Sequence, residues 1–137
     1  MNGPIKILAI EDDEFIRILL MDIFWIHGVK DNLQLLLASN ISEARDILNR
    51  EKPALIILDM MLPEKEEEPL NKLAGCKFLE ELKKNSRTRD IKILVFSGFD
   101  DKELKEKAMK LGADKFLVKG EHMPKELLDS IKELINI

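Results

Sequence analysis

Cysteine and long apolar segments are both scarce in this chain of 137 residues. Cys76 is the only cysteine, so no disulfide can form within the chain, and a reducing cytoplasm is the expected location. No apolar run approaches the length that spans a bilayer, and the first residues lack the pattern of a signal peptide. We therefore expect a cytoplasmic protein that does not enter a membrane.

The chain also lacks an excess of positive charge, because its 22 basic residues face 26 acidic ones and the net charge is -4. Nucleic-acid-binding proteins usually carry a basic surface, so direct contact with nucleic acid is not expected. With 45% hydrophobic residues, the chain suits one core and is too short for two ordinary domains. Residues 1–137 are expected to form a single domain.

Five short apolar segments alternate with five segments of helical pattern. The apolar segments predict strands, and they cover residues 5–10, 33–38, 55–58, 91–96 and 114–118. Alternation of strands and helices indicates a parallel sheet with helices on both faces. Since the crossovers are right-handed, a doubly wound α/β sandwich is the expected fold.

The first predicted helix covers residues 13–27, and Gly28 predicts its end. Its buried face is predicted from apolar residues at helical spacing, which are Ile16, Leu19, Leu20, Ile23 and Phe24. Further helices are expected over residues 42–48, after Gly75, over 101–111 and after Pro124. The polar, glutamate-rich stretch 64–73 predicts a solvated loop.

Polar side chains follow four of the predicted strands at the edge where the strands end. Ligands of open α/β sheets bind at this edge. Taken singly, each residue has a structural interpretation as a helix cap, a turn residue or a solvated charge. Taken together, they place compatible chemistry at four strand ends: Glu11, Asp12 and Asp13, then Asp59, Ser97 and Lys119.

Clustered carboxylates repel one another unless a cation neutralises them, and an oxygen cage with room for water suits Mg²⁺. Asp59 beside such a cation and Lys119 could attack a phosphoryl group. The ammonium would then neutralise the transferred oxygens while the Ser97 hydroxyl donates to one of them. The pattern predicts formation of an aspartyl phosphate.

Four motifs, in residues 7–17, 55–63, 95–98 and 112–119, resemble those of the receiver domain of two-component response regulators, including the chemotaxis regulators. The resemblance covers nearly the whole chain. It implies a flavodoxin-like three-layer sandwich with five helices and strand order 2-1-3-4-5. It also implies that Asp59 accepts phosphate from a histidine kinase or a histidine phosphotransfer protein.

For the metal, the resemblance implies that Asp12 ligates Mg²⁺ directly and that Glu11 acts through water. Asp59 and the backbone carbonyl of Met61 complete the protein ligands. Arg17 falls where the family often has arginine, which favours the pair Glu11 and Asp12. The alternative register pairs Asp12 with Asp13.

For the switch, the resemblance implies that Ser97 and Lys119 bind the phosphoryl oxygens and that Phe116 is the rotating aromatic residue. Phe116 could also be an ordinary strand residue. A stand-alone receiver would signal through its fourth helix, fifth strand and fifth helix. A homodimer is compatible with the charged helix 101–111 but not required.

Three features depart from the family pattern. The loop 64–74 is longer than usual by about eight residues, and long loops are often functional. It could be a partner contact, a lid or a solvated insertion.

Gly120 replaces the usual proline after Lys119, so the usual cis peptide is not expected there. Met61 and Phe99 occupy the positions that tune dephosphorylation, and neither can orient a water, which predicts slow loss of phosphate.

Two alternatives remain at this stage. A pseudo-receiver would keep the fold as an interaction module without accepting phosphate. A phosphatase with an aspartyl nucleophile would need a second acid two residues later, where this chain has Met61. We therefore expect no enzyme activity beyond the receiver's own phosphorylation and dephosphorylation.

Overall fold

The computed structural model describes residues 3–70, 73–98, 101–120 and 124–137. Five parallel strands form one sheet in the order β2-β1-β3-β4-β5, which confirms the predicted fold and strand order. The strands are β1 (Ile5–Ile10), β2 (Leu33–Ala38), β3 (Leu55–Leu58), β4 (Lys92–Ser97) and β5 (Lys115–Val118).

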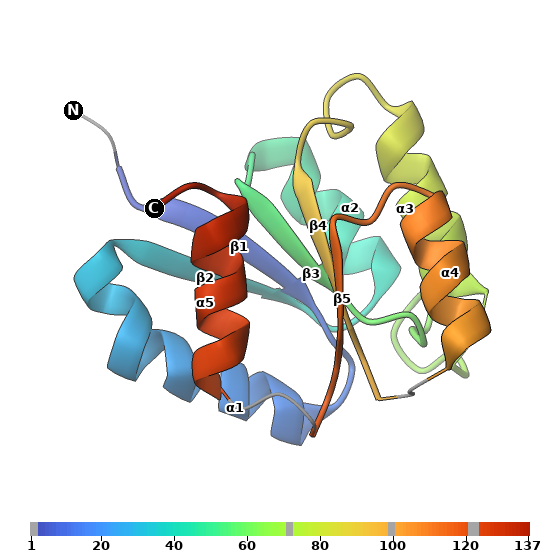
Figure 1. Cartoon of the computed structure of the whole chain (residues 1–137). Helices are drawn as coiled ribbons and strands as arrows, with labels where there is room; N and C mark the ends of the chain where they lie inside the picture. The colour runs from blue at the N-terminus through green and yellow to red at the C-terminus, as the bar shows by residue number, and fades with distance from the viewer. Residues whose placement is uncertain (1–2, 71–72, 99–100, 121–123) are drawn as a thin grey trace.

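Helices cover both faces of the sheet, with α1 and α5 on one face and α2, α3 and α4 on the other (Figure 1). Their bounds are α1 (Glu14–Ile23), α2 (Ile41–Arg50), α3 (Ala74–Lys84), α4 (Lys102–Lys110) and α5 (Pro124–Leu134). Each face of the sheet carries its own apolar core. Because β3 lies in the middle of the sheet, all four of its residues are buried, which explains its unbroken apolar run. In the described part of the chain, no helix is both long and apolar enough to cross a bilayer.

The prediction that Gly28 ends the first helix is wrong. The chain stays helical beyond α1 through a π turn, Phe24–Gly28, and a 3-10 turn, Val29–Asp31. Gly28 has a helical φ of -84°, and the turn into β2 comes at Asn32, which has a left-handed φ of 59°. A Cβ at Gly28 would lie 3.3 Å from the ring of Phe24 and 3.6 Å from Leu33. The small size of Gly28 therefore permits close packing of the helix on β2.

The predicted burial of Leu19 is also wrong, because this side chain is 40% exposed. Leu20, Ile23 and Phe24 form the buried face of the helix, as predicted, and Ile16 packs partly against the same core. The helix has more apolar residues than its contact with the sheet can cover, so spacing alone did not distinguish the inner residues from the outer ones. α1 consequently presents large apolar side chains on its outer face as well.

Candidate functional site

The carboxyl edge of the sheet brings the predicted polar residues together by continuing the strand ladder beyond β1, β3 and β5. The amide of Glu11 donates to Ala38 O at 2.9 Å, and that of Asp59 donates to Ile10 O at 3.2 Å. The amide of Lys119 donates to Ser97 O at 2.6 Å. These backbone bonds give the side chains at the strand ends defined positions.

Three carboxylates form the centre of the site. Oxygen atoms of Glu11, Asp12 and Asp59 all lie within 4.8 Å of one another. Glu11 is only 3% exposed and Asp59 only 7%, whereas Asp12 is half-buried. The cluster offers only oxygen ligands and is more open on the side of Asp12. Such a site fits a hard divalent cation that keeps some of its water, such as Mg²⁺.

Lys119 supplies the positive charge of the site. Its Nζ forms an ion pair with Glu11 and a second one, of 3.0 Å, with Oδ2 of Asp59. The other oxygen of Asp59, Oδ1, accepts a hydrogen bond of 3.1 Å from the amide of Met61. Both oxygens of Asp59 are thus held in place, and Oδ2 lies beside an ammonium group.

One ammonium does not fully neutralise three carboxylates, and the pKa values reflect this. Burial and the neighbouring charge of Asp59 raise the pKa of Glu11 to about 8. The same two causes raise the pKa of Asp12 above its usual range. Burial lowers the pKa of Lys119, but the carboxylates of Asp59 and Glu11 outweigh that effect and raise it. The cluster therefore favours a further cation.

Asp13 does not join this cluster, because its side chain caps α1. Its Oδ1 accepts hydrogen bonds from the amides of Phe15 at 2.8 Å and Ile16 at 3.3 Å. Arg17 instead fixes the two preceding residues, since its Nη1 donates to Glu11 O at 3.1 Å and to Asp12 O at 2.6 Å. The geometry thus favours the Glu11 and Asp12 register over the Asp12 and Asp13 register.

Gly75 sets the path of the chain after Asp59. Its amide donates to Met60 O at 3.2 Å, and a Cβ at position 75 would lie 2.5 Å from Met60 Cα and Met60 O. Real Cβ atoms essentially never approach backbone this closely, so only glycine lets α3 begin so near the end of β3. The signal in the sequence for this role is a glycine at the start of a predicted helix.

The first residues of the long loop are anchored to α2. The amides of Ile41 and Ser42 donate to Pro63 O at 3.2 Å and to Glu64 O at 2.9 Å. Arg45 on α2 also forms ion pairs with Glu64 and, at 2.8 Å, with Glu81. The acidic stretch that follows Glu64 is exposed, as the sequence predicted for a solvated loop.

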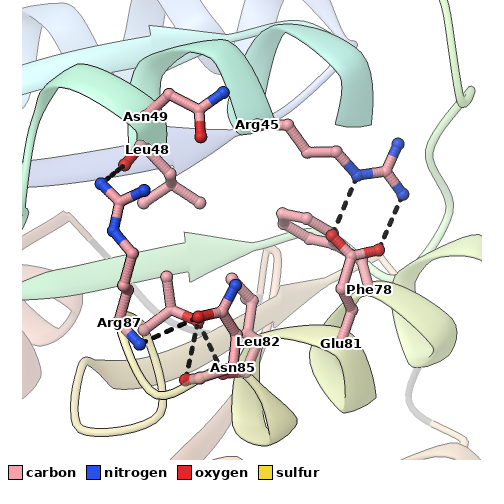
Figure 2. Close-up of a pocket in the computed structure, with 9 residues that line it drawn as sticks. Arg45, Leu48, Asn49, Phe78, Glu81, Leu82, Asn85 and Arg87 are labelled. Carbon is pink, nitrogen blue, oxygen red and sulfur yellow. Dashed lines mark hydrogen bonds and ion pairs between the residues drawn. The ribbon is translucent and has the colours of Figure 1, made fainter.

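Figure 2 shows the Arg45 guanidinium beside the Glu81 carboxylate, at one end of a hollow of about 240 Å³ between α2 and α3. The two carboxylates on Arg45 raise its pKa further above its already high value. Sequence analysis missed Arg45, because Glu64 and Glu81 lie 19 and 36 residues away along the chain. The hollow does not include Asp59.

The remaining predicted residues have clear positions, with one exception. Ser97 ends β4 and is 1% exposed. Phe116 is 8% exposed and belongs to the core cluster that contains Ala108 and Ala113. Gly120 has a φ of +84°, which proline cannot adopt, so the loop after Lys119 differs in backbone shape from one with proline. Phe99 lies outside the described residues.

The five-stranded doubly wound sheet with an acidic cluster and a lysine at its carboxyl edge is an open α/β fold of the flavodoxin-like class, in which ligands bind at this edge. The model of the response regulator receiver domain matches residues 7–132, so the chain belongs to the response regulator receiver family.

Among curated relatives, the chain is 31% identical over 130 residues to the phosphate regulon transcriptional regulatory protein PhoB of Escherichia coli (strain K12). That match covers 95% of this chain and 51% of PhoB, so the chain spans about half the length of the curated relatives it matches.

Two solved structures share the fold. One is a CheY-like response regulator receiver domain protein from Methanospirillum hungatei JF-1, with a TM-score of 0.79 and 24% identity over 98% of this chain and 95% of that one. The other is the receiver domain of the sensor histidine kinase PA1611 from Pseudomonas aeruginosa PAO1, which has a magnesium ion in its active-site cleft. It matches with a TM-score of 0.79 and 18% identity, over 98% of this chain and all of that chain.

Proposed function

We propose that Asp59 is the phosphoacceptor of a two-component phosphorelay. The observation that carries this proposal is the position of its carboxylate. Oδ2 of Asp59 lies 3.0 Å from Nζ of Lys119, and carboxylate oxygens of Asp59, Glu11 and Asp12 lie within 4.8 Å of one another. An oxygen held beside a cation can attack phosphorus while charge on the phosphoryl group is neutralised.

The donor is a histidine kinase or a histidine phosphotransfer protein, as for receiver domains generally. An Asp59 oxygen forms a bond to phosphorus as the phosphorus–nitrogen bond of phosphohistidine breaks, and the histidine keeps the bonding electron pair. The product is an aspartyl phosphate. Lys119 and the Ser97 hydroxyl bind oxygens of the transferred group.

The reaction depends on Mg²⁺, which neutralises charge on the carboxylates and on the phosphoryl group. Asp12 and Asp59 are the direct carboxylate ligands, Glu11 acts through water, and Met61 contributes its backbone carbonyl. The magnesium ion in the related PA1611 receiver domain supports this assignment. The raised pKa values of Glu11 and Asp12, which result from burial and from the charge of Asp59, support it independently.

Phosphorylation then shifts an equilibrium between two conformations. Ser97 moves toward the phosphoryl group, and Phe116 occupies the space behind it. The change is transmitted to a protein partner through α4, β5 and α5. The domain works in the cytoplasm by protein contact, without binding nucleic acid itself. Residues 1–137 act as one receiver domain.

The test is intact mass after incubation with Mg²⁺ and acetyl phosphate, with Asp59→Asn as the matched variant. We expect one phosphoryl adduct on the wild type, no adduct on Asp59→Asn and no adduct in the presence of a chelator. An exposed substitution, Asp129→Asn on α5, serves as the control and should keep the adduct.

Absence of an adduct on the wild type, together with failure to bind beryllofluoride, would identify a pseudo-receiver instead. The long acidic loop 64–74 would then be the first segment to shorten, because it follows Asp59 closely and could restrict access.

A further inference from the structure

The outer face of α1 and the two short turns that extend it carries most of the large exposed apolar side chains. Seven of the eleven such residues in the described part of the chain lie between positions 15 and 29, and they are 40% to 84% exposed. We call them the α1 outer face, and they are Phe15, Ile18, Leu19, Met21, Trp25, Ile26 and Val29.

The size of the α1 outer face is that of a protein interface. The largest of its side chains each carry about 150–250 Å² of surface, so the exposed fractions together amount to roughly 600–900 Å². The largest apolar patch of an ordinary monomer is about 300–600 Å². A stable complex buries about 800 Å² on each partner. The α1 outer face therefore has the area that one side of a stable interface needs.

The face continues into a groove beside the edge of the sheet. Met21, Trp25 and Val29 lie one turn apart and line this groove of about 390 Å³ together with Leu35 and Leu37 of β2. Edge strands usually carry lysine or proline, which discourage association. β2 has the sequence LQLLLA and carries neither.

The charged residues beside the α1 outer face complement those of a second, identical copy of the face. An acidic and a basic residue flank Ile26 on opposite sides along this helical segment, and they are Asp22 in α1 and Lys30 in the 3-10 turn. Asp22 and Lys30 are both exposed, and each lies four residues from Ile26. Neither of them has an ion-pair partner within the described residues. Two antiparallel copies related by a two-fold axis near Ile26 would bring Asp22 of each copy to Lys30 of the other.

We propose that the α1 outer face is the interface of a homodimer, with Ile26 and Trp25 at its centre and two Asp22–Lys30 ion pairs at its sides. An interface between identical patches needs this kind of self-complementarity. A membrane surface would instead select a polar border rich in lysine and arginine, whereas this face places Asp22 among its apolar residues. The proposal requires no phosphorylation and does not depend on the role of Asp59.

Trp25 provides a direct signal, because it is the only tryptophan in the chain and is 79% exposed in the single copy. The unphosphorylated full chain is studied in the presence of chelator by sedimentation velocity and by tryptophan fluorescence over a dilution series. We expect a monomer–dimer equilibrium in which dimerisation shifts the Trp25 emission to shorter wavelength. Ile26→Glu should raise the dissociation constant more than tenfold, and Met109→Glu, at an exposed position on α4, should leave it unchanged.

The charge pair offers a stricter test. Asp22→Lys and Lys30→Asp should each weaken the dimer, because each brings like charges together twice. An equimolar mixture of the two variants should form a heterodimer, and the double variant with both changes should dimerise like the wild type. Circular dichroism checks that each variant is folded.

Three results would overturn the proposal. One is a wild type that stays monomeric at every concentration, and another is a dimer that Ile26→Glu does not weaken. The third is a failure of the mixed charge variants to associate while the wild type does. A monomer that binds phosphatidylglycerol vesicles through Ile26 would assign the face to a membrane instead of a second copy.

Discussion

In most proteins charged groups are exposed and large apolar groups are buried. The carboxyl edge of the sheet and the outer face of α1 depart from this pattern in opposite ways. At the edge, charged groups are buried, and Asp59, Glu11 and Lys119 partner one another. On α1, large apolar groups are exposed, and no contact within the described chain covers them. Exposed single apolar residues are common, but buried charges and large apolar patches are informative.

The comparison shows where to look for chemistry and where to look for association. Burial of charge at the edge costs stability that Lys119 recovers in part and that a bound cation would recover further. The exposed apolar surface on α1 contributes no hydrophobic stabilisation in the single copy, and a partner that covers it would supply that stabilisation. Four predictions test this contrast.

The largest effect concerns burial on the two sides of the same helix. Leu20 is fully buried and Trp25 is 79% exposed. Leu20→Ala should lower the free energy of unfolding by about 2–5 kcal/mol, because it leaves a cavity. Trp25→Ala should change that of the monomer by less than about 0.5 kcal/mol, as for most surface substitutions. Urea unfolding at low protein concentration measures both, and equal losses would contradict the contrast.

The next effect concerns the cation of the buried site. Lys119→Met should slow phosphorylation by acetyl phosphate about 100-fold, the usual consequence of removing a group that stabilises developing charge. Lys119→Arg should recover part of the rate, and Lys110→Met, on the exposed side of α4, should have the wild-type rate. Quench-flow followed by intact mass gives the rates. An unchanged rate in Lys119→Met would remove Lys119 from the chemistry.

A more gradual effect, smaller over any single pH unit, follows from the raised pKa of Glu11. Its pKa is about 8 in the folded protein and 4.5 for an ordinary glutamate, so between these pH values the folded state binds more protons than the unfolded state. The free energy of unfolding of the metal-free protein should therefore fall as pH rises through this window, by about 1 kcal/mol for each pH unit, and level off above it.

Glu11→Gln should remove most of this pH dependence, and Glu106→Gln, on the exposed side of α4, should keep it. Added Mg²⁺ should stabilise the wild type most at the alkaline end, because a metal competes with protons for the carboxylates. Urea unfolding at pH 5, 6, 7 and 8 with chelator or Mg²⁺ measures these effects. A pH profile that is the same in Glu11→Gln would contradict the assignment.

The smallest effect concerns the lifetime of the phosphoryl group. Met61 cannot orient a water by hydrogen bonding, so the phosphorylated wild type should lose its phosphate slowly, over minutes or longer. Met61→Asn should accelerate the loss several-fold, and Met109→Asn should not. Intact mass after removal of the donor follows the decay. Loss within seconds from the wild type, or no change in Met61→Asn, would refute this prediction.

The sheet and the acidic edge could be predicted because their signals are local. Each strand is a short apolar run, and the polar residue that follows it necessarily reaches the same edge in a parallel sheet. That rule alone brings Asp59 and Lys119 together across 60 residues. The family resemblance then supplied roles that the geometry of the strand ends does not specify.

The features that sequence analysis missed depend on distant partners or on a choice between two uses of one residue. The ion pairs of Arg45 join three segments that have no shared pattern in the chain. Gly28 could end a helix or permit close packing, and only its contact with Phe24 distinguishes the two. Leu19 could lie on either edge of the apolar stripe, and the width of the contact with the sheet decided it.

The two anchors of the long loop make the segment between them a natural place for insertion. Pro63 and Glu64 are tied to the start of α2, and Gly75 is tied to Met60. Extra residues between these points would lengthen a loop whose ends are already closed, and the entropy of closure grows only slowly with length. A fluorescent peptide or a small binding domain could therefore be grafted after Glu66, leaving Asp59 and its neighbours in place and turning the receiver into a sensor of its own phosphorylation.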